Sequence, residues 1–453
     1  MRDDSIPAEP LATAPAASPG ADSPWVSWGA VAVLLLCAQL SITDRQILSL
    51  LVDPIKRDLG LTDTQLGLLQ GFAFAIVYSV AGLPIGWAVD RAPRRIILFL
   101  GVMVWSLSTA ACGLARSFPA LIIPRATVGA GEAAVAPVSV SLIGDLFPPQ
   151  RAGLALGVYA AGFSVGSGVA LALGGLIFGL FGGRPTAQLP LIGQVWTWQA
   201  VFLALGAPGV LAAFLAFAIR EPPRPRRKGE RGSPGVAELP LGAFIGRRWR
   251  VVALVYGGFA LTTLVAYAVS GWTPAFLGRT FGWSTGRIGA VFGAVVMAGG
   301  LAGSLLGGWC IDWLHRRGRE DACLLVGAVA CALATPLLVG AYWLPSPGLV
   351  LLALGFGLAA AQASGPAAYA SLRLIAPPHL RGRLTAGFVL VASLLGTGLG
   401  PLAVGLATDF ILGDERRVGA ALSIVVMAAL PNAAALLALA HHAWRARAPL
   451  ELT

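Results

Sequence analysis

Long apolar runs alternate with short charged segments along almost the whole chain. Each run has about the 20 residues that an α-helix needs to cross the hydrocarbon core of a bilayer, whereas strands of a membrane barrel are about 10 residues long and alternate apolar and polar positions. The pattern therefore predicts an all-α integral membrane protein. We expect twelve spans, at 26–51, 64–89, 95–114, 118–145, 150–180, 196–219, 250–277, 285–311, 322–343, 348–373, 380–409 and 418–443.

Composition supports a membrane protein and gives its orientation. Hydrophobic residues make up 57% of the chain, charged residues 12%, and the mean hydropathy is +0.78. This leaves too little polar surface to cover a soluble globule. The net charge of +11 comes mostly from Arg and Lys in segments on the side of the N-terminus, so the positive-inside rule places both termini in the cytoplasm. We expect these basic segments to contact membrane lipids and not nucleic acid.

A segment rich in Pro, Gly and charge, "EPPRPRRKGERGSPGVAELPL", begins at Glu221 and separates six spans from six. We therefore expect two six-helix bundles joined by a linker. The predicted domains are a disordered cytoplasmic tail at 1–25, bundles at 26–220 and 249–445, a basic cytoplasmic linker at 221–248 and a short tail at 446–453.

An internal repeat supports this division. "GWAVDRAPRR" between spans 2 and 3 matches "GWCIDWLHRR" between spans 8 and 9, and Arg151, Gly157 and Gly166 match Arg381, Gly387 and Gly396 at a second constant offset. Matches between equivalent loops and spans indicate two bundles related by an axis along the membrane normal, as in many secondary transporters.

The first repeat predicts a latch on the cytoplasmic side. Its glycines can let helices approach closely, and its aspartates are expected at helix ends, where they can pair with basic residues or with the N-terminus of a neighbouring helix. Simple anchoring of Arg and Asp at the membrane interface is the alternative. The predicted cytoplasmic gate consists of Gly86, Asp90, Arg94, Arg95, Gly308, Asp312, Arg316 and Arg317.

These motifs, with R-x-x-x-G-x-G in span 4, resemble the major facilitator superfamily. "TDR" in span 1, "LLVDPIKRDLGLTDTQLGLLQG" after it, and "RATVGAGEA" and "IGDLFPP" in span 4 resemble its Spinster-like branch of sphingolipid and lysolipid transporters. The resemblance implies a fold in which spans 1 and 4 are neighbours and the molecule alternates between outward-open and inward-open states. It also implies that Asp44 and Glu132 are proton-linked acids and that Arg125 binds a headgroup.

Four ionisable residues lie well inside predicted spans: Asp44, Arg45, Arg125 and Glu132. Each costs about 2.5 to 3.5 kcal/mol there, which favours partners, water or a function. Asp44 and Arg125 should lie at equal depth, about 10 Å below the outer surface, so they can pair. Glu132 follows Arg125 by two helical turns, on the same face and about 10 Å deeper, and Gly129 and Gly131 should clear space beside it.

This charged cluster has two interpretations. It could only hold spans 1 and 4 together, but small or apolar residues would do so at less cost. It could instead exchange protons for a substrate, because protonating an acid would free Arg125 for a phosphate or carboxylate. Arg45 could pair with an acid or bind substrate, and Arg125 and Glu132 are also expected to contact the substrate. The second half contributes uncharged polar groups, including Tyr267 and Gln362, so the cavity should suit an amphipathic substrate.

The leading functional prediction is therefore a proton-coupled secondary transporter of amphipathic lipids such as lysophospholipids or sphingosine-phosphate-like molecules. A transporter of a small organic anion or drug, and a membrane-embedded enzyme or receptor, are the alternatives. "GFSVG" at 162–166 lies within a span and has no nearby His and acid, and no ATP-binding motif occurs. We expect no enzyme activity, cofactor or metal site, and a monomer in a bacterial inner membrane.

Overall fold

Most of the chain forms long helices whose axes are roughly aligned and which cross the molecule from one end to the other. A computed structural model describes residues 24–181, 184–189, 192–222 and 240–445. Nearly all of the predicted tails and most of the predicted linker lie outside these residues. Within them, twelve helical stretches are long and apolar enough to span a bilayer, from Trp25–Leu50 to Glu415–Arg445, so the prediction of twelve spans is confirmed.

The first half of the chain contains α1 (Pro24–Leu50), α2 (Val52–Leu59), α3 (Asp63–Gly67), the π-helix η1 (Leu68–Phe72), α4 (Ala73–Val89), α5 (Arg94–Cys112), α6 (Phe118–Glu132), α7 (Val135–Leu146), α8 (Pro149–Leu180), α9 (Thr197–Ala213) and the 3-10 helix η2 (Phe214–Ala218). Two strands that the sequence analysis did not predict, β1 (Thr186–Leu189) and β2 (Gly193–Trp196), form an antiparallel hairpin in which Thr186 pairs with Trp196.

The second half contains α10 (Leu241–Phe281), α11 (Thr285–Arg316), α12 (Ala322–Ala341), α13 (Pro347–Gln362), α14 (Ser364–Ile375), the 3-10 helix η3 (Pro378–Leu380), α15 (Arg381–Val391), the π-helices η4 (Ala392–Gly398) and η5 (Ala407–Leu412) on either side of α16 (Leu399–Leu406), the 3-10 helix η6 (Glu415–Arg417) and α17 (Val418–Arg445).

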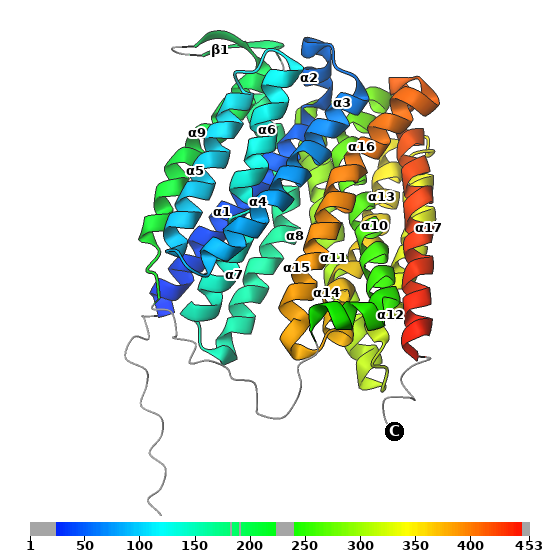
Figure 1. Ribbon diagram of the computed structural model, residues 1–453. Coiled ribbons are helices and arrows are strands. Elements are labelled where there is room, and N and C mark those ends of the chain that lie inside the picture. Colours follow the sequence, from blue (N-terminus) through cyan, green and yellow to red (C-terminus); the bar gives the residue numbers. More distant parts are fainter. Residues whose placement is uncertain (1–23, 182–183, 190–191, 223–239, 446–453) are drawn as a thin grey trace, which may run out of the picture.

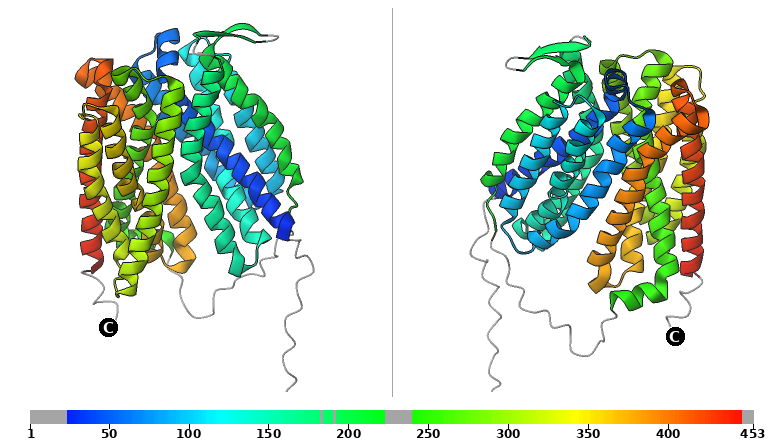
Figure 2. Two further views of the ribbon diagram at one scale, coloured as in Figure 1. Left: turned by 180° about the vertical axis from the view of Figure 1, so that it is seen from behind. Right: turned by 45° about the horizontal axis from the view of Figure 1, so that its top comes forward.

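The two halves lie beside each other and meet at one end (Figure 1). We call the end that carries β1 and β2 the hairpin side, and the end where α1 begins and α17 finishes the terminal side. The halves approach at the hairpin side and diverge toward the terminal side, and the two further views agree (Figure 2).

Glycines hold the halves close together near the hairpin side. A Cβ atom added to Gly71 of η1 would lie 2.5 Å from the carbonyl oxygen of Gly398, and one added to Gly67 would lie 2.7 Å from that of Pro401. Between α8 and α11, a Cβ added to Gly168 would lie 2.4 Å from the carbonyl oxygen of Gly293. No side chain fits at these crossings without displacing backbone, so glycine permits the contact.

The glycines of the repeated motif do not have this role here. A Cβ added to Gly86 or Gly308 would meet no atom within 4 Å, so the expected close helix approach at these positions is wrong for this structure. Gly129 and Gly131 also differ from expectation. They do not clear space beside Glu132, because the backbones of α4 and α5 pack directly against them.

The two copies of the repeated motif have different surroundings. Arg94 is buried, and it donates hydrogen bonds to Asp145, Ser141, Glu221 and the carbonyl oxygen of Pro222, all in the first half. Asp90 caps the C-terminus of α4, and Arg95 is exposed. In the second copy the side chains of Asp312, Arg316 and Arg317 are exposed. Asp312 lies inside α11 and not, as was expected, at its end.

An ionic network joins the two halves at the hairpin side. Arg279 of α10 donates two hydrogen bonds to Asp63 of α3, at 2.7 and 3.0 Å, and a third to Asp53 of α2, at 2.8 Å. Lys56 contacts Asp63 at 2.7 Å and Glu415 at 2.5 Å. We call these five residues the hairpin-side network. It is buried at its centre, where the side chain of Asp63 has no exposed area and that of Arg279 is 8% exposed.

Helix capping strengthens the same junction. Asp409 of η5 accepts hydrogen bonds from the backbone N–H groups of Thr64 and Asp63, at 2.7 and 3.3 Å, so a carboxylate of one half caps a helix of the other. Burial raises the pKa of Asp53 above its ordinary value, although Arg279 acts in the opposite direction. Burial acts to lower the pKa of Lys56, but its bonds to Asp63 and Glu415 outweigh burial and raise it. Lys56 therefore remains charged at physiological pH.

Replacing Gly71 by alanine should destabilise the fold. The added methyl group would displace the backbone at Gly398, and overpacking of this kind costs about 1 to 3 kcal/mol. Equilibrium unfolding in detergent micelles measures the change. Gly86→Ala is the matched control, because its Cβ meets no neighbour and alanine favours a helix. Equal stability of the two variants would contradict the account of these crossings.

Replacing Arg279 by glutamine should separate the halves at the hairpin side. It leaves the buried Asp63 without its main cation, and breaking a buried pair costs about 3 to 5 kcal/mol. Spin labels on Arg57→Cys and Arg416→Cys, both at exposed positions, report the separation after Cys310, the least buried native cysteine, is replaced by serine. We expect a longer distance in Arg279→Gln and a partial return when Asp63→Asn is added. An unchanged distance distribution in Arg279→Gln would show that the network does not hold the halves.

Candidate functional site

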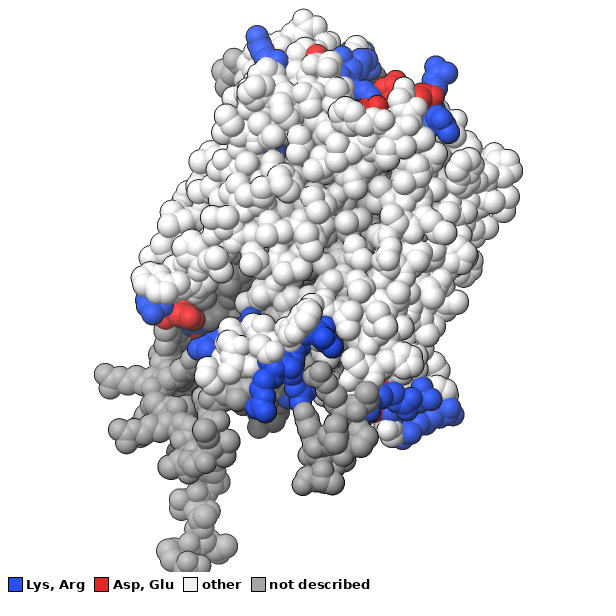
Figure 3. All heavy atoms as spheres, turned by 45° about the vertical axis from the view of Figure 1, so that its right-hand side comes forward, with Lys and Arg blue, Asp and Glu red and all other residues white. Residues whose placement is uncertain are grey.

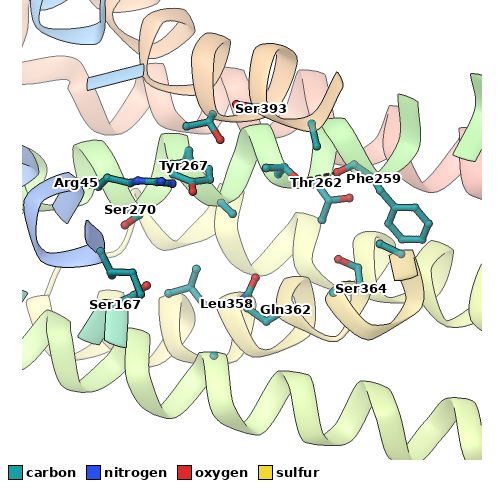
Figure 4. A pocket seen from close by; sticks show the side chains of 18 of the residues that line it. Arg45, Ser167, Phe259, Thr262, Tyr267, Ser270, Leu358, Gln362, Ser364 and Ser393 are labelled. Atoms are coloured by element: carbon teal, nitrogen blue, oxygen red, sulfur yellow. Dashed lines mark hydrogen bonds between the residues drawn. The ribbon is translucent and has the colours of Figure 1, made fainter. Parts of the chain in front are cut away.

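An elongated cavity of about 470 Å³ lies between the two halves. Figure 4 shows Arg45 at one end and Phe259 at the other, with Gln362 and Leu358 along one wall. Arg45 lies about 30 Å along α1 from the start of that helix on the terminal side, whereas Phe388 lies about 10 Å from the start of α15. The Phe388 end of the cavity is therefore nearer the terminal side. The polar residues that line the cavity are Arg45, Gln46, Tyr78, Ser167, Thr262, Thr263, Tyr267, Ser270, Gln362, Ser364, Tyr369, Ser393 and Thr397.

Arg45 is the only charged side chain among the described residues that line this cavity. Its Nε atom donates a 2.6 Å hydrogen bond to Oε2 of Glu132, which also accepts one from Ser41 at 2.7 Å. The side chain of Arg45 is 26% exposed, whereas that of Glu132 has no exposed area. Arg45 therefore connects a sealed carboxylate with the open cavity.

Asp44 and Arg125 form a second ion pair that is sealed from the cavity. Nη1 of Arg125 lies 2.6 Å from Oδ2 of Asp44, and Thr109 donates a 2.6 Å hydrogen bond to the other carboxylate oxygen. The side chains of Arg125 and Asp44 are 2% and 5% exposed. The pairing predicted from their equal depth is confirmed.

The arginines of both ion pairs lie near one aromatic ring. The guanidinium of Arg45 lies 4.5 Å from the centre of the Phe74 ring and that of Arg125 lies 5.7 Å from it. Tyr78 adds a second ring, 5.3 Å from Arg45. Cations near aromatic faces gain electrostatic stabilisation that hydrophobic side chains do not supply, so Phe74 helps to keep both arginines in an apolar region.

Glu132 and Gln362 occupy equivalent positions in the two halves, each at a break between two helices. The hydropathy pattern predicts continuous spans here, but α6 ends at Glu132 and α13 ends at Gln362. Pro137 and Pro366 follow, and each removes the N–H that would bond to the carbonyl four residues earlier. Glu132 and Gln362 are separated by the same number of residues as the repeat partners Arg151 and Arg381. An acid in one half therefore corresponds to its uncharged amide in the other.

The end of the cavity nearest the terminal side is aromatic. The ring of Phe388 makes edge contacts with Tyr256, Phe259 and Tyr369, with centroid distances of 5.7, 6.5 and 6.3 Å. Phe259, Tyr369 and Phe388 line the cavity. The cavity thus changes from cationic at Arg45 to aromatic at Phe388.

A smaller cavity of about 20 Å³ lies next to Arg45, toward the hairpin side. Its volume is sufficient for one water molecule. Gln70 lines it, and the buried Nε2 atom of Gln70 has no hydrogen-bond partner among the described residues. Ser270 of α10 donates a 2.9 Å hydrogen bond to Gln46 of α1 beside this space, so the two halves also touch here.

The structure separates the predicted site residues into two groups. Arg45, Tyr267 and Gln362 line the main cavity. Arg125 and Glu132, which were also expected to contact substrate, do not line it, and Asp44 is sealed with Arg125. The reason is helix rotation: α6 presents both residues to α1 and not to the second half.

Sequence reasoning missed several residues of the site. Gln46 follows Arg45 directly and extends a short polar run in an otherwise apolar span, which was a usable signal. The aromatic residues at the terminal end gave no signal, because Phe and Tyr are common in lipid-facing and core positions alike. The hairpin-side network was hidden for another reason: its charges lie at span ends, where charged residues normally face water.

Comparison with known proteins agrees with the architecture. The family model described as Major Facilitator Superfamily matches residues 34–401. An MFS-type efflux pump of Mycolicibacterium smegmatis is 28% identical over 409 residues, covering 89% of this chain and 90% of the relative. A probable L-galactonate transporter of Escherichia coli is 28% identical over 328 residues, covering 68% of each protein.

Spinster proteins are also similar. Protein spinster of Drosophila melanogaster is 27% identical over 395 residues, which cover 85% of this chain and 62% of the fly protein. The crystal structure of a bacterial homologue of the human lysosomal transporter Spinster, in an inward-facing and unoccupied conformation, is 26% identical with a TM-score of 0.78 and covers 93% of this chain and 96% of that one. Together with the twelve spans, these matches show that the chain belongs to the Major Facilitator Superfamily and is a transporter, not an enzyme.

Proposed function

We propose that the chain is a proton-coupled secondary transporter of amphipathic anions, of the lysophospholipid or sphingosine-phosphate-like class, and that it works by alternating access. The observation that carries the proposal is the position of Arg45, which lines the elongated cavity and at the same time holds the sealed carboxylate of Glu132. The resemblance of the span 1 and span 4 motifs to the Spinster-like branch of sphingolipid and lysolipid transporters also favours a lipid-like substrate, and Spinster proteins are among the similar relatives.

The shape and polarity of the cavity favour an amphiphile. A phosphate or carboxylate headgroup would bind Arg45, with hydrogen bonds from polar neighbours such as Tyr267 and Gln362. The hydrocarbon chain would extend toward the aromatic end at Phe388 and Tyr369. A cavity of this size is within the usual range for small-molecule sites.

Proton coupling follows from competition for Arg45. An anionic substrate that binds the guanidinium draws it away from Glu132, which is left as a buried carboxylate without its cation. Such a charge is costly, so Glu132 takes up a proton. When the substrate leaves, the proton is released and the pair forms again. Asp44 is the second proposed proton-linked acid. Protonation of Asp44 would break its ion pair and free Arg125.

The orientation and the gates complete the proposal. We propose that the terminal side faces the cytoplasm of a bacterium and the hairpin side faces outward across the inner membrane, because basic residues are in excess on the terminal side. In the arrangement described, the hairpin-side network then closes the outside, and the cavity faces inward. Closure toward the cytoplasm would bring the two motif copies together, with Arg94 and Arg317 among their residues. A monomer suffices, because both halves of the site come from one chain.

A transporter of small organic anions is the second candidate. It is favoured by the similarity to a probable L-galactonate transporter and by the hydroxyl groups of Thr262, Thr263 and Ser393 in the cavity. A sugar acid would use Arg45 for its carboxylate and these hydroxyls for its own, and it would leave the aromatic end unused.

Replacing Arg45 by alanine should abolish most transport of an anionic lysolipid. Hydrogen bonds to charged groups contribute about 1.5 to 3 kcal/mol, so we expect apparent affinity to fall roughly 10- to 100-fold, with partial recovery in Arg45→Lys. Uptake of a fluorescent lysophosphatidate into proteoliposomes measures this. Arg57→Ala, an exposed arginine on α2, is the matched control. Normal uptake by Arg45→Ala would remove Arg45 from the binding site.

Glu132→Gln should uncouple transport from the proton gradient. The amide retains the size and hydrogen bonding of the protonated acid but binds no proton, so we expect lysolipid to equilibrate with little response to an imposed pH gradient. Adding Gln362→Glu, at the equivalent position of the second half, to Glu132→Gln tests whether a carboxylate there restores the response to the pH gradient. Gradient-driven accumulation by Glu132→Gln equal to wild type would refute its role.

Competition distinguishes the two candidate substrates. Unlabelled lysophosphatidate should compete with the fluorescent lysolipid, and competition should weaken as the acyl chain is shortened, because a shorter chain loses contact with the aromatic end. Galactonate should not compete. Strong competition by galactonate, with no effect of chain length, would instead support the small organic anion.

A further inference from the structure

The first residues of α10 lie across the terminal side of the molecule. In Figure 1 this segment is the green stretch that runs across the bottom of the second half, before α10 turns to run through the bundle. The turn occurs at Arg248, whose backbone angles (φ −121°, ψ 16°) are not helical. Residues 241–250 therefore form a separate surface segment, attached to a spanning helix.

This segment has an apolar anchor and an apolar exposed face. Phe244 is buried against the second half, and the guanidinium of Arg248 lies 5.8 Å from the centre of the Trp444 ring of α17. Ile245 and Trp249 are 39% and 56% exposed. Trp at the end of a spanning helix is typical of the membrane–water interface.

The same segment is strongly basic. It contains Arg247, Arg248 and Arg250 and no Asp or Glu. Arg247 and Arg250 are exposed, and neither forms an ion pair with any residue that the structure describes. Basic side chains gather along the edge of the molecule on the terminal side (Figure 3). Arg250 lies 5.6 Å from the Trp249 ring, so its charge stays beside the apolar face.

We propose that residues 241–250 form a binding site for an anionic phospholipid of the surrounding bilayer. Arg247 and Arg250 would bind the headgroup phosphate, and Ile245 and Trp249 would enter the region where headgroups meet acyl chains. A partner that satisfies both the charges and the apolar side chains must itself be amphipathic. A nucleic acid or an acidic peptide would leave Ile245 and Trp249 in water.

The site acts on a helix that carries other functional residues. α10 also supplies Tyr267 and Ser270 to the main cavity and Arg279 to the hairpin-side network. A lipid bound at the bend would hold the terminal end of this helix at a fixed depth while its other end is held by the network. The inference does not depend on which substrate is transported.

Titration with lipid tests the site. Purified protein in detergent micelles would be titrated with phosphatidylglycerol or phosphatidylcholine, and tryptophan fluorescence would follow thermal unfolding. Binding raises the unfolding midpoint by mass action. Each arginine near an anionic surface contributes about 1 kcal/mol, so the half-saturating concentration of phosphatidylglycerol should rise roughly 30-fold in the double variant Arg247→Ala/Arg250→Ala.

Two control variants keep the result specific. Arg287→Ala removes an arginine that also lies over a tryptophan, 4.1 Å from the Trp283 ring, and it should leave the titration unchanged. Arg247→Lys/Arg250→Lys retains the charge and should recover most of the affinity. The proposal is overturned if the alanine double variant responds to phosphatidylglycerol as wild type does, if phosphatidylcholine stabilises equally, or if Arg287→Ala weakens binding to the same extent.

Discussion

The structure depends on neutralising two arginines inside a region where water does not compensate charge. Arg125 and Arg45 each pair with a carboxylate at 2.6 Å, and the ring of Phe74 lies near both guanidiniums. Because an unpaired charge there is costly, each member of a pair constrains the other. The pairs differ in one respect: Arg45 lines the cavity and Arg125 does not, so only the Arg45 pair is accessible to a molecule in the cavity. The two ion pairs therefore differ in their access to the cavity, although both join α1 to α6.

The two halves share a backbone plan but not a charge pattern. Proline-dependent breaks follow Glu132 and Gln362 at equivalent places, but Gln362 lines the cavity whereas Glu132 bonds to α1. In the proposed mechanism, an acid in one half and an amide in the other confine proton chemistry to the first half, and the second half supplies hydroxyl groups and aromatic rings. The proposed amphipathic anion would place its charge against Arg45 of α1 and its apolar part against α15. The hairpin-side network and the glycine crossings hold the halves together near the hairpin side.

Much of this could be predicted from sequence, and the exceptions have physical reasons. Span lengths follow from bilayer thickness, and the Asp44–Arg125 pair follows from equal depth along two neighbouring helices. The contact of Arg45 with Glu132 could not be predicted, because it depends on the rotation of α1 about its axis, which packing determines. The glycines of the repeated motif misled for a similar reason: a glycine shows that a close approach is permitted, not that a helix lies there. The hairpin-side network joins residues that are far apart in sequence, so no local pattern marks Arg279 as the partner of Asp63.

The central claim is that an anionic substrate and Glu132 compete for Arg45, so that substrate binding and proton binding are linked. Counting protons during binding tests this most directly: lysophosphatidate is added to purified protein in weakly buffered solution, and a pH-sensitive dye records the change. The account predicts about one proton taken up for each anion bound to wild type and none in Glu132→Gln. Saturable binding to wild type without proton uptake, or equal uptake by both proteins, would contradict it.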